Sequence, residues 1–165
     1  KTVIKEMFAS DGQKVLEIYQ AGIETRNATF EISSPSWDDW DLKHHKHSRF
    51  IYERDGIVVG WVALSPVSLR KVYSGVAEVS IYIDLNFSKQ GIGSKLLEQA
   101  IKSSEDNGIW TLQSSVFPEN IATQRLHEKF GFRILGIREK IALLDGIWRN
   151  TILLERRSKL VGVDK

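Results

Sequence analysis

The chain has 165 residues, 42% of them hydrophobic and 27% charged, and its 23 basic and 21 acidic side chains leave a net charge of +2. That length suits one compact domain, expected to span residues 1–165, and the mixed charges offer no electrostatic footprint for nucleic acid or an anionic membrane. Cysteine is absent, which excludes disulfides and zinc–thiolate sites, and no apolar run approaches the roughly 18 residues of a membrane span.

The first predicted elements are a strand and a helix. Residues 2–8 alternate well enough for a strand. Asp11 is placed to cap a helix that turns four side chains toward a core, namely Val15, Leu16, Ile18 and Tyr19. The segment Glu24–Pro35 has no clean period and is predicted to be a loop.

A second helix and a hairpin follow this loop. Ser36 and Asp39 have the spacing of a capping box, which predicts a short helix through roughly residue 47. Phe50–Arg54 and Ile57–Leu64 then flank Asp55-Gly56, a strong signal for a two-residue hairpin turn.

The second half of the chain alternates strands with helices. The predicted strands are Ala77–Ile83, Trp110–Val116, Phe132–Leu144 and Trp148–Leu154, and the predicted helices are Gly91–Glu105 and Asn120–Phe130. The complete order is β-α-α-β-β-β-α-β-α-β-β. Because hairpins come first and βαβ-like units later, we expect an α/β fold with a central mixed sheet and helices on both faces.

The turn before the helix Gly91–Glu105 carries the most chemical information. Gly91 and Gly93 let the backbone approach a ligand closely, and the first N–H groups of a helix have no partners within it. Together with the helix dipole they predict an anion site suited to a pyrophosphate. The glycines alone are equally consistent with a plain strand-to-helix turn, and the pattern is neither the dinucleotide fingerprint nor a P-loop.

The motifs around these glycines resemble those of the GNAT acetyltransferase superfamily. Its central motif, Gln/Arg-x-x-Gly-x-Gly/Ala at a helix start, is matched by Ser88–Gly93, with Ser88 where Gln or Arg is usual. Phe117–Asn120 and Leu126–Phe132 are similar to the family's Asn followed by Leu-Tyr-Glu-Lys-x-Gly-Phe. The resemblance covers roughly residues 3–157 and implies the GNAT fold, with acetyl-CoA as co-substrate.

More narrowly, the chain resembles the phosphinothricin N-acetyltransferase branch of that superfamily. The matching stretches are Thr25–Phe30, Gly60–Ser68, Arg70, Gly75–Ser80 and Trp148-Arg149. This branch implies transfer of an acetyl group to the primary α-amine of an amino-acid-like substrate such as phosphinothricin or methionine sulfoximine. Direct attack within a ternary complex is the mechanism that the superfamily generally uses, and the absence of cysteine excludes an acyl-cysteine intermediate.

Two residues are predicted to be catalytic. Glu78 matches the branch's catalytic glutamate. A carboxylate can serve as the general base there, because an α-amine titrates at about 7.7–8 and its proton is easily removed near neutral pH. His127 lies where many family members carry a tyrosine that protonates the leaving thiolate. A surface ion pair is the alternative for Glu78, and simple packing on the helix is an equal alternative for His127.

For acetyl-CoA, the resemblance implies contacts from a strand, a loop and one asparagine. The residues are Ile81, Tyr82 and Ile83 beside the pantetheine arm, Lys89, Gln90, Gly91, Ile92, Gly93 and Ser94 at the pyrophosphate, and Asn120.

The acceptor is expected to meet Arg26, Phe30, Arg70 and Tyr73, which lie in regions that border the acceptor pocket of GNAT folds. An arginine can hold a carboxylate bidentately, although any one arginine is more often a solvated surface residue. The cluster of His44, His45 and His47 is typical of a polar helix end, and no metal is predicted.

Several alternatives stay open. The acceptor could be a polyamine, an aminoglycoside or a protein N-terminus, and the chain could be a non-catalytic CoA-binding module, although the presence of Glu78 argues against the last. No nucleic acid or membrane partner is expected, and the cytosol is the default location because residues 1–20 lack a signal-peptide core. The resemblance implies a homodimer.

Overall fold

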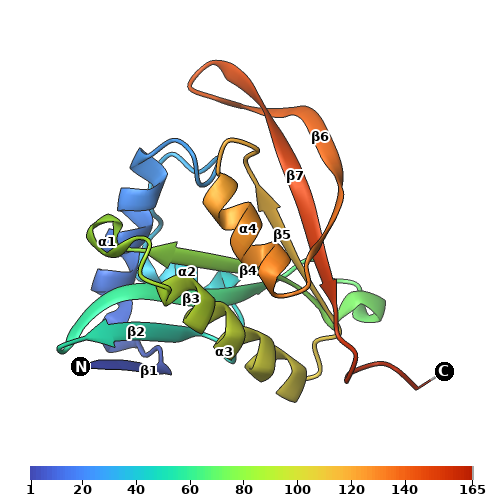
Figure 1. Ribbon diagram of the computed structural model, residues 1–165, viewed down its shortest axis with the longest axis horizontal. Coiled ribbons are helices and arrows are strands. Elements are labelled where there is room, and N and C mark those ends of the chain that lie inside the picture. The colour runs from blue at the N-terminus through green and yellow to red at the C-terminus, as the bar shows by residue number, and fades with distance from the viewer. Residues whose placement is uncertain (165) are drawn as a thin grey trace.

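A seven-stranded mixed sheet with helices packed on both faces forms the framework of the chain (Figure 1). The computed structural model describes residues 1–164. The strands are β1 (Thr2–Glu6), β2 (Phe50–Arg54), β3 (Ile57–Pro66), β4 (Val76–Ile83), β5 (Thr111–Val116), β6 (Arg133–Leu144) and β7 (Ile147–Arg157). The helices are α1 (Gly12–Glu24), α2 (Trp37–Lys43), α3 (Ile92–Asp106) and α4 (Ile121–Lys129), with short 3-10 turns η1 (Ala9–Asp11), η2 (Lys71–Tyr73) and η3 (Leu85–Phe87). The predicted fold class and the predicted order of strands and helices are confirmed.

The sheet opens near its middle. Its strand order is β1-β2-β3-β4-β5-β7-β6, and β4 and β5 are the parallel pair, in register only from Val76↔Thr111 to Glu78↔Gln113. Beyond that point β4 continues beside β3 while β5 continues beside β7, so the two central strands part. Figure 1 shows β5, β6 and β7 turned away from the half of the sheet that holds β1 to β4.

Two cores lie on opposite faces of the sheet. Alternate residues of β3 supply both of them, because successive side chains of a strand point to opposite faces: Val62 and Leu64 face α3, whereas Trp61 and Ala63 face α1 and α2. The helix α3 contributes its predicted apolar face, Ile92, Leu96, Leu97, Ala100 and Ile101. Within residues 1–164, no helix is both long and apolar enough to cross a membrane.

The helix α2 is shorter than the sequence predicts. It begins as expected, with the Ser36 hydroxyl accepting from the Asp39 N–H at 3.2 Å, but it ends at Lys43 instead of near residue 47. The cause is Arg49, whose buried guanidinium donates to the carbonyl oxygens of His44 and His45 at 3.1 and 2.8 Å. These carbonyls are therefore satisfied by a side chain four to five residues further along the chain, which turns into an extended conformation at His44.

Asp11 does not cap α1 as predicted. Its carboxylate instead accepts from the Phe8 N–H at 2.9 Å and closes the short turn η1, so that α1 begins at Gly12 without a side-chain cap. The predicted strand over residues 2–8 likewise ends at Glu6.

Burial of α3 is expected to dominate the stability of the central core. Leu96 is 0% exposed, so Leu96→Ala should lower the free energy of unfolding by about 2–5 kcal/mol, through lost burial and the cavity left behind. Leu69, which is fully exposed, gives the matched control, and Leu69→Ala should change that free energy by no more than about 0.5 kcal/mol. Urea unfolding of the two variants measures the difference, and equal losses would contradict this account of the core.

Candidate active site

The parting of β4 and β5 leaves a cleft with a volume of about 640 Å³. Its walls come from β4 and neighbouring Ser65 of β3, the end of β5, α1, the end of α2, α4, β7 and the loop between α1 and α2. Among the sequence-predicted site residues, those that line the cleft are Glu78, Ile81, Tyr82, Ile83, Asn120, His127 and Phe30. The structure therefore brings both predicted catalytic side chains to one cavity.

Glu78 lies at the point where the sheet opens. It is the last β4 residue in register with β5, and it lies directly opposite Ser65 of β3. Its carboxylate Oε1 accepts a hydrogen bond from the Gln113 side-chain amide at 3.1 Å. The partner predicted by the alternative reading, a cation in a surface ion pair, is not found for Glu78 within residues 1–164. The carboxylate is thus oriented by a neutral neighbour at the edge of the cleft.

His127 faces the same cleft from α4, and its hydrogen bonds define its tautomer. The ring is 3% exposed, and Nδ1 lies 2.7 Å from the carbonyl oxygen of Thr123. Because a carbonyl oxygen only accepts, Nδ1 carries the proton and Nε2 is left as an acceptor, buried and without a partner among the described residues. Burial lowers the pKa of His127, although the Thr123 carbonyl acts in the opposite direction. The ring is therefore neutral near pH 7.

The N-terminus of α4 is tied to the loop that covers the cleft. Asn120 caps the helix by accepting from the Thr123 N–H at 3.3 Å, and its amide donates to the Asn27 carbonyl at 3.4 Å. Arg149 of β7 donates to the Arg26 carbonyl at 2.9 Å and lies 4.0 Å from the centroid of the Phe117 ring. Sequence reasoning had noted Arg149 only as part of a matching stretch, because its partners lie far away along the chain.

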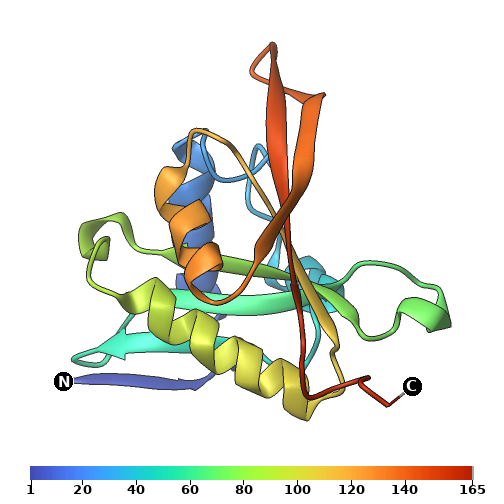
Figure 2. The same ribbon diagram turned by 45° about the vertical axis from the view of Figure 1, so that its right-hand side comes forward.

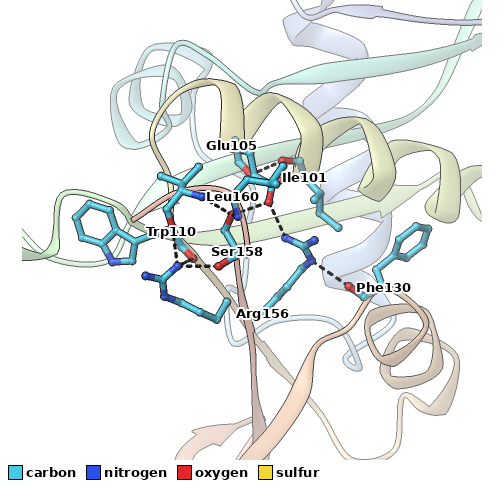
Figure 3. A network of polar contacts seen from close by, with 10 residues as sticks. Ile101, Glu105, Trp110, Phe130, Arg156, Ser158 and Leu160 are labelled. Atoms are coloured by element: carbon cyan, nitrogen blue, oxygen red, sulfur yellow. Dashed lines mark hydrogen bonds and ion pairs between the residues drawn. The ribbon is translucent and has the colours of Figure 1, made fainter. Parts of the chain in front are cut away.

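The other end of α4 is held by a polar network (Figure 3). Arg156 of β7 donates from Nε to the Phe130 carbonyl at 3.1 Å, and its guanidinium lies 3.5 Å from the carboxylate of Glu105 on α3. The Ser158 hydroxyl donates to the same carboxylate at 2.6 Å. The C-terminal end of the helix that carries His127 is therefore held by an arginine of β7.

The beginning of α3 has the features of an anion site. Gly91 has φ of +77° and precedes the helix without any side-chain cap, so the first N–H groups of α3 have no acceptor within the helix. A Cβ on Gly93 would lie 3.1 Å from the Leu126 side chain, so glycine allows α3 and α4 to lie close together. Lys129 adds a cation, donating to the Ser94 hydroxyl at 3.3 Å. The cleft runs along β4 to Leu85 and so ends shortly before Lys89–Ser94, which do not line it.

Three of the residues predicted to meet the acceptor do not line the cleft. Arg26 forms an ion pair with Asp145 at 3.1 Å, and Arg70 lies 5.5 Å from the ring centroid of Tyr73. Arg70 and Tyr73 belong to the connection between β3 and β4, which projects from the sheet at the right of Figure 2. Phe30, by contrast, lines the cleft and packs edge-on against Phe117 at 5.0 Å between ring centroids.

The three neighbouring histidines turn to different partners. His44 stacks on Trp40 with 3.9 Å between ring centroids, whereas His45 and His47 stack on each other at 4.7 Å. Among residues 1–164, no group of three His, Cys, Asp or Glu side chains is arranged to hold a metal ion. His44 and its neighbour Lys43 line the cleft, which the sequence did not predict.

Comparison with known proteins agrees with this arrangement. The model described as "Acetyltransferase (GNAT) family" matches residues 13–132. The chain belongs to this family and is an N-acetyltransferase.

Several of its relatives are named as phosphinothricin acetyltransferases, and others as acetyltransferases of amino acids. The L-amino acid N-acetyltransferase AaaT of Escherichia coli is 30% identical over 159 residues, covering 93% of this chain and 96% of that protein. Phosphinothricin N-acetyltransferase of Streptomyces viridochromogenes is 25% identical over 161 residues, covering 95% and 88%. The crystal structure of a phosphinothricin acetyltransferase from Sinorhizobium meliloti in complex with AcCoA has the same fold, with a TM-score of 0.90 at 22% identity over 99% of this chain and 92% of that one.

The four histidines predict how stability depends on pH. Burial lowers the pKa of His44, His45, His47 and His127 in the folded chain, whereas an unfolded histidine titrates near about 6.5. As the pH falls through that value, the unfolded chain takes up protons that the folded chain does not. The free energy of unfolding should therefore be nearly constant from pH 8 to about 7 and should decrease below about 6.5.

Urea midpoints measured across this range check the decline, and NMR of the imidazole nitrogens checks the tautomer of His127. The expected spectrum at pH 7 shows Nδ1 protonated and Nε2 bare. A His127 that titrates above the ordinary value, or that carries its proton on Nε2, would contradict the geometry described above.

Proposed function

We propose that the chain transfers the acetyl group of acetyl-CoA to the primary α-amine of an amino-acid-like acceptor, such as phosphinothricin or methionine sulfoximine, by direct attack in a ternary complex. The observation that carries this proposal is the position of Glu78 at the fork between β4 and β5, beside a cleft that leads toward an anion-ready helix end. The names of the curated relatives support the acceptor class.

The residues present fit acetyl-CoA as the donor substrate. Past Glu78, the β4 segment Ile81–Ile83 has lost β5 as a neighbour, so its edge is free to pair with the extended pantetheine arm. At the end of the cleft, the uncapped N–H groups of α3 and the flanking Lys89 and Lys129 suit a pyrophosphate. Asn120, at the start of α4, also lines the cleft. Bound there, acetyl-CoA supplies the activated acyl group.

Glu78 acts in this proposal as the general base. An α-amine must lose a proton before or during attack on a thioester, and a carboxylate that acts directly or through one water suffices because the amine titrates at about 7.7–8. The hydrogen bond from Gln113 fixes one carboxylate oxygen, which limits the rotation of the side chain. The base is thus oriented toward the cleft before any substrate arrives.

His127 returns a proton to the thiolate in this proposal, with one condition set by its tautomer. Because Nδ1–H is donated to the Thr123 carbonyl, Nε2 has to accept a proton before it can give one away. An α-ammonium loses two protons on becoming an amide: Glu78 receives one, and the other can protonate Nε2, which then gives it to the leaving thiolate. The ring then cycles between neutral and charged forms during each turnover.

A homodimer, which the family resemblance implies, stays a prediction. The hairpin of β6 and β7 projects from the rest of the chain (Figure 2). Large apolar side chains on it are exposed, including Ile137, Ile147 and Trp148. Such a surface suits contact with a second copy.

The activity is tested by following free thiol release from acetyl-CoA against a panel of amines. Phosphinothricin and methionine sulfoximine should give the highest kcat/KM, because curated relatives are named for these acceptors. Spermidine, an aminoglycoside and a peptide N-terminus serve as comparison acceptors. If the thiol is released faster with any of these amines, the proposed acceptor class is wrong. If acetyl-CoA binds but no amine causes thiol release, the chain does not catalyse the reaction.

Replacing the proposed base separates its role from cofactor binding. Glu78→Gln should lower kcat at pH 7 by about 100-fold or more, because general-base catalysis is typically worth 10²–10⁴-fold, and leave the affinity for acetyl-CoA unchanged. The deficit should narrow as the pH rises, since the amine then deprotonates by itself. Glu98→Gln, at an exposed position of α3, is the matched control. Unchanged turnover in Glu78→Gln would remove this residue from the reaction.

A further inference from the structure

One wall of the cleft is formed by the C-terminal end of α2, which no sequence motif predicted. Lys43 and His44 both line the cleft. Their position is fixed by the buried Arg49, which donates to the His44 carbonyl at 3.1 Å, and by the His44 ring, whose Nδ1–H is donated to the Trp40 carbonyl at 2.6 Å. This end of α2 is therefore a rigid part of the site.

The same wall lies close to the proposed base. The His45 N–H donates to the Leu64 carbonyl at 2.8 Å, which holds the end of α2 against β3. Leu64 is followed by Ser65, and Ser65 lies directly opposite Glu78. Opposed residues of an antiparallel pair are about 4.5–5.5 Å apart between Cα atoms, so only one strand spacing separates this anchor point from Glu78.

Within residues 1–164, Lys43 is the one lysine or arginine that lines the cleft, and the carboxylates of its lining are Glu31 and Glu78. No carboxylate within residues 1–164 forms an ion pair with Lys43. Arg26 and Arg70, the cations that the sequence offered for the acceptor, lie outside the lining and contact Asp145 and Tyr73 instead. The cleft thus holds a single cation on the wall beside its base.

We propose that Lys43 binds the α-carboxylate of the acceptor while Glu78 receives the proton of its amine, and that this pair of charges selects amino acids over simple amines. The inference rests on the proposed function, because it assumes an amino-acid-like acceptor. The amine and carboxylate of such a molecule are attached to one carbon, so a cation that binds the carboxylate has to lie near the base. The flexible stem of a lysine at the rim lets the acceptor enter before its charge is bound.

The test compares methionine sulfoximine with its primary carboxamide, which keeps the shape and loses the negative charge. In Lys43→Gln, KM for methionine sulfoximine should rise about tenfold or more, the equivalent of about 1.4 kcal/mol, with kcat and the KM for acetyl-CoA unchanged. The carboxamide should be acetylated equally by both proteins. Lys43→Arg should recover most of the loss, and Lys43→Glu should enlarge it.

Lys102→Gln, at an exposed position on α3, is the matched control and should behave as the unaltered protein. The inference is overturned if Lys43→Gln leaves KM for methionine sulfoximine unchanged, or raises it equally for the carboxamide. A protein that acetylates other amines but no amino acid overturns the proposed function and this inference together. If amino acids are acetylated equally well by the unaltered protein and by Lys43→Gln, only the inference about Lys43 is overturned.

Discussion

The site depends on the short parallel pairing between β4 and β5. Only three residue pairs join these strands, and the last of them, Glu78 with Gln113, places a carboxylate at the fork. The elements that follow the two strands are positioned relative to that fork: α3 begins beyond the end of β4, and α4, which lines the cleft, follows the end of β5. A longer parallel ladder would fill the cleft with backbone and leave no edge for an extended substrate.

Much of the fold could be predicted from the sequence because its signals are local. The Asp55-Gly56 turn and the glycine before α3 each act on neighbouring residues, and the structure has an element boundary at both. The cofactor end of the candidate site was accessible for the same reason, since an uncapped helix end is a property of one short segment. The family resemblance then supplied the expected roles of Glu78 and His127.

The parts that sequence reasoning missed depend on side-chain contacts that no periodic pattern of the sequence records. Arg49 ends α2 early by bonding to its carbonyls, and this moves Lys43 from a predicted helix interior to the wall of the cleft. Arg149 holds the early loop across a separation of more than a hundred residues. The apolar pattern of a helix contains no record of such partners, because a buried arginine and a surface arginine look alike in a sequence.

The network around Arg156 has a practical meaning for anyone who attaches a label or another protein to this chain. Arg157 also binds the segment that follows, donating to the carbonyls of Val161 and Gly162 at 2.8 and 2.6 Å, so the last residues of β7 are anchored on both sides. A fusion joined before Ser158 would remove a hydroxyl that helps to hold Glu105, and with it part of the support of α4. The damage would reach the imidazole in the cleft although the junction lies far from it in the fold.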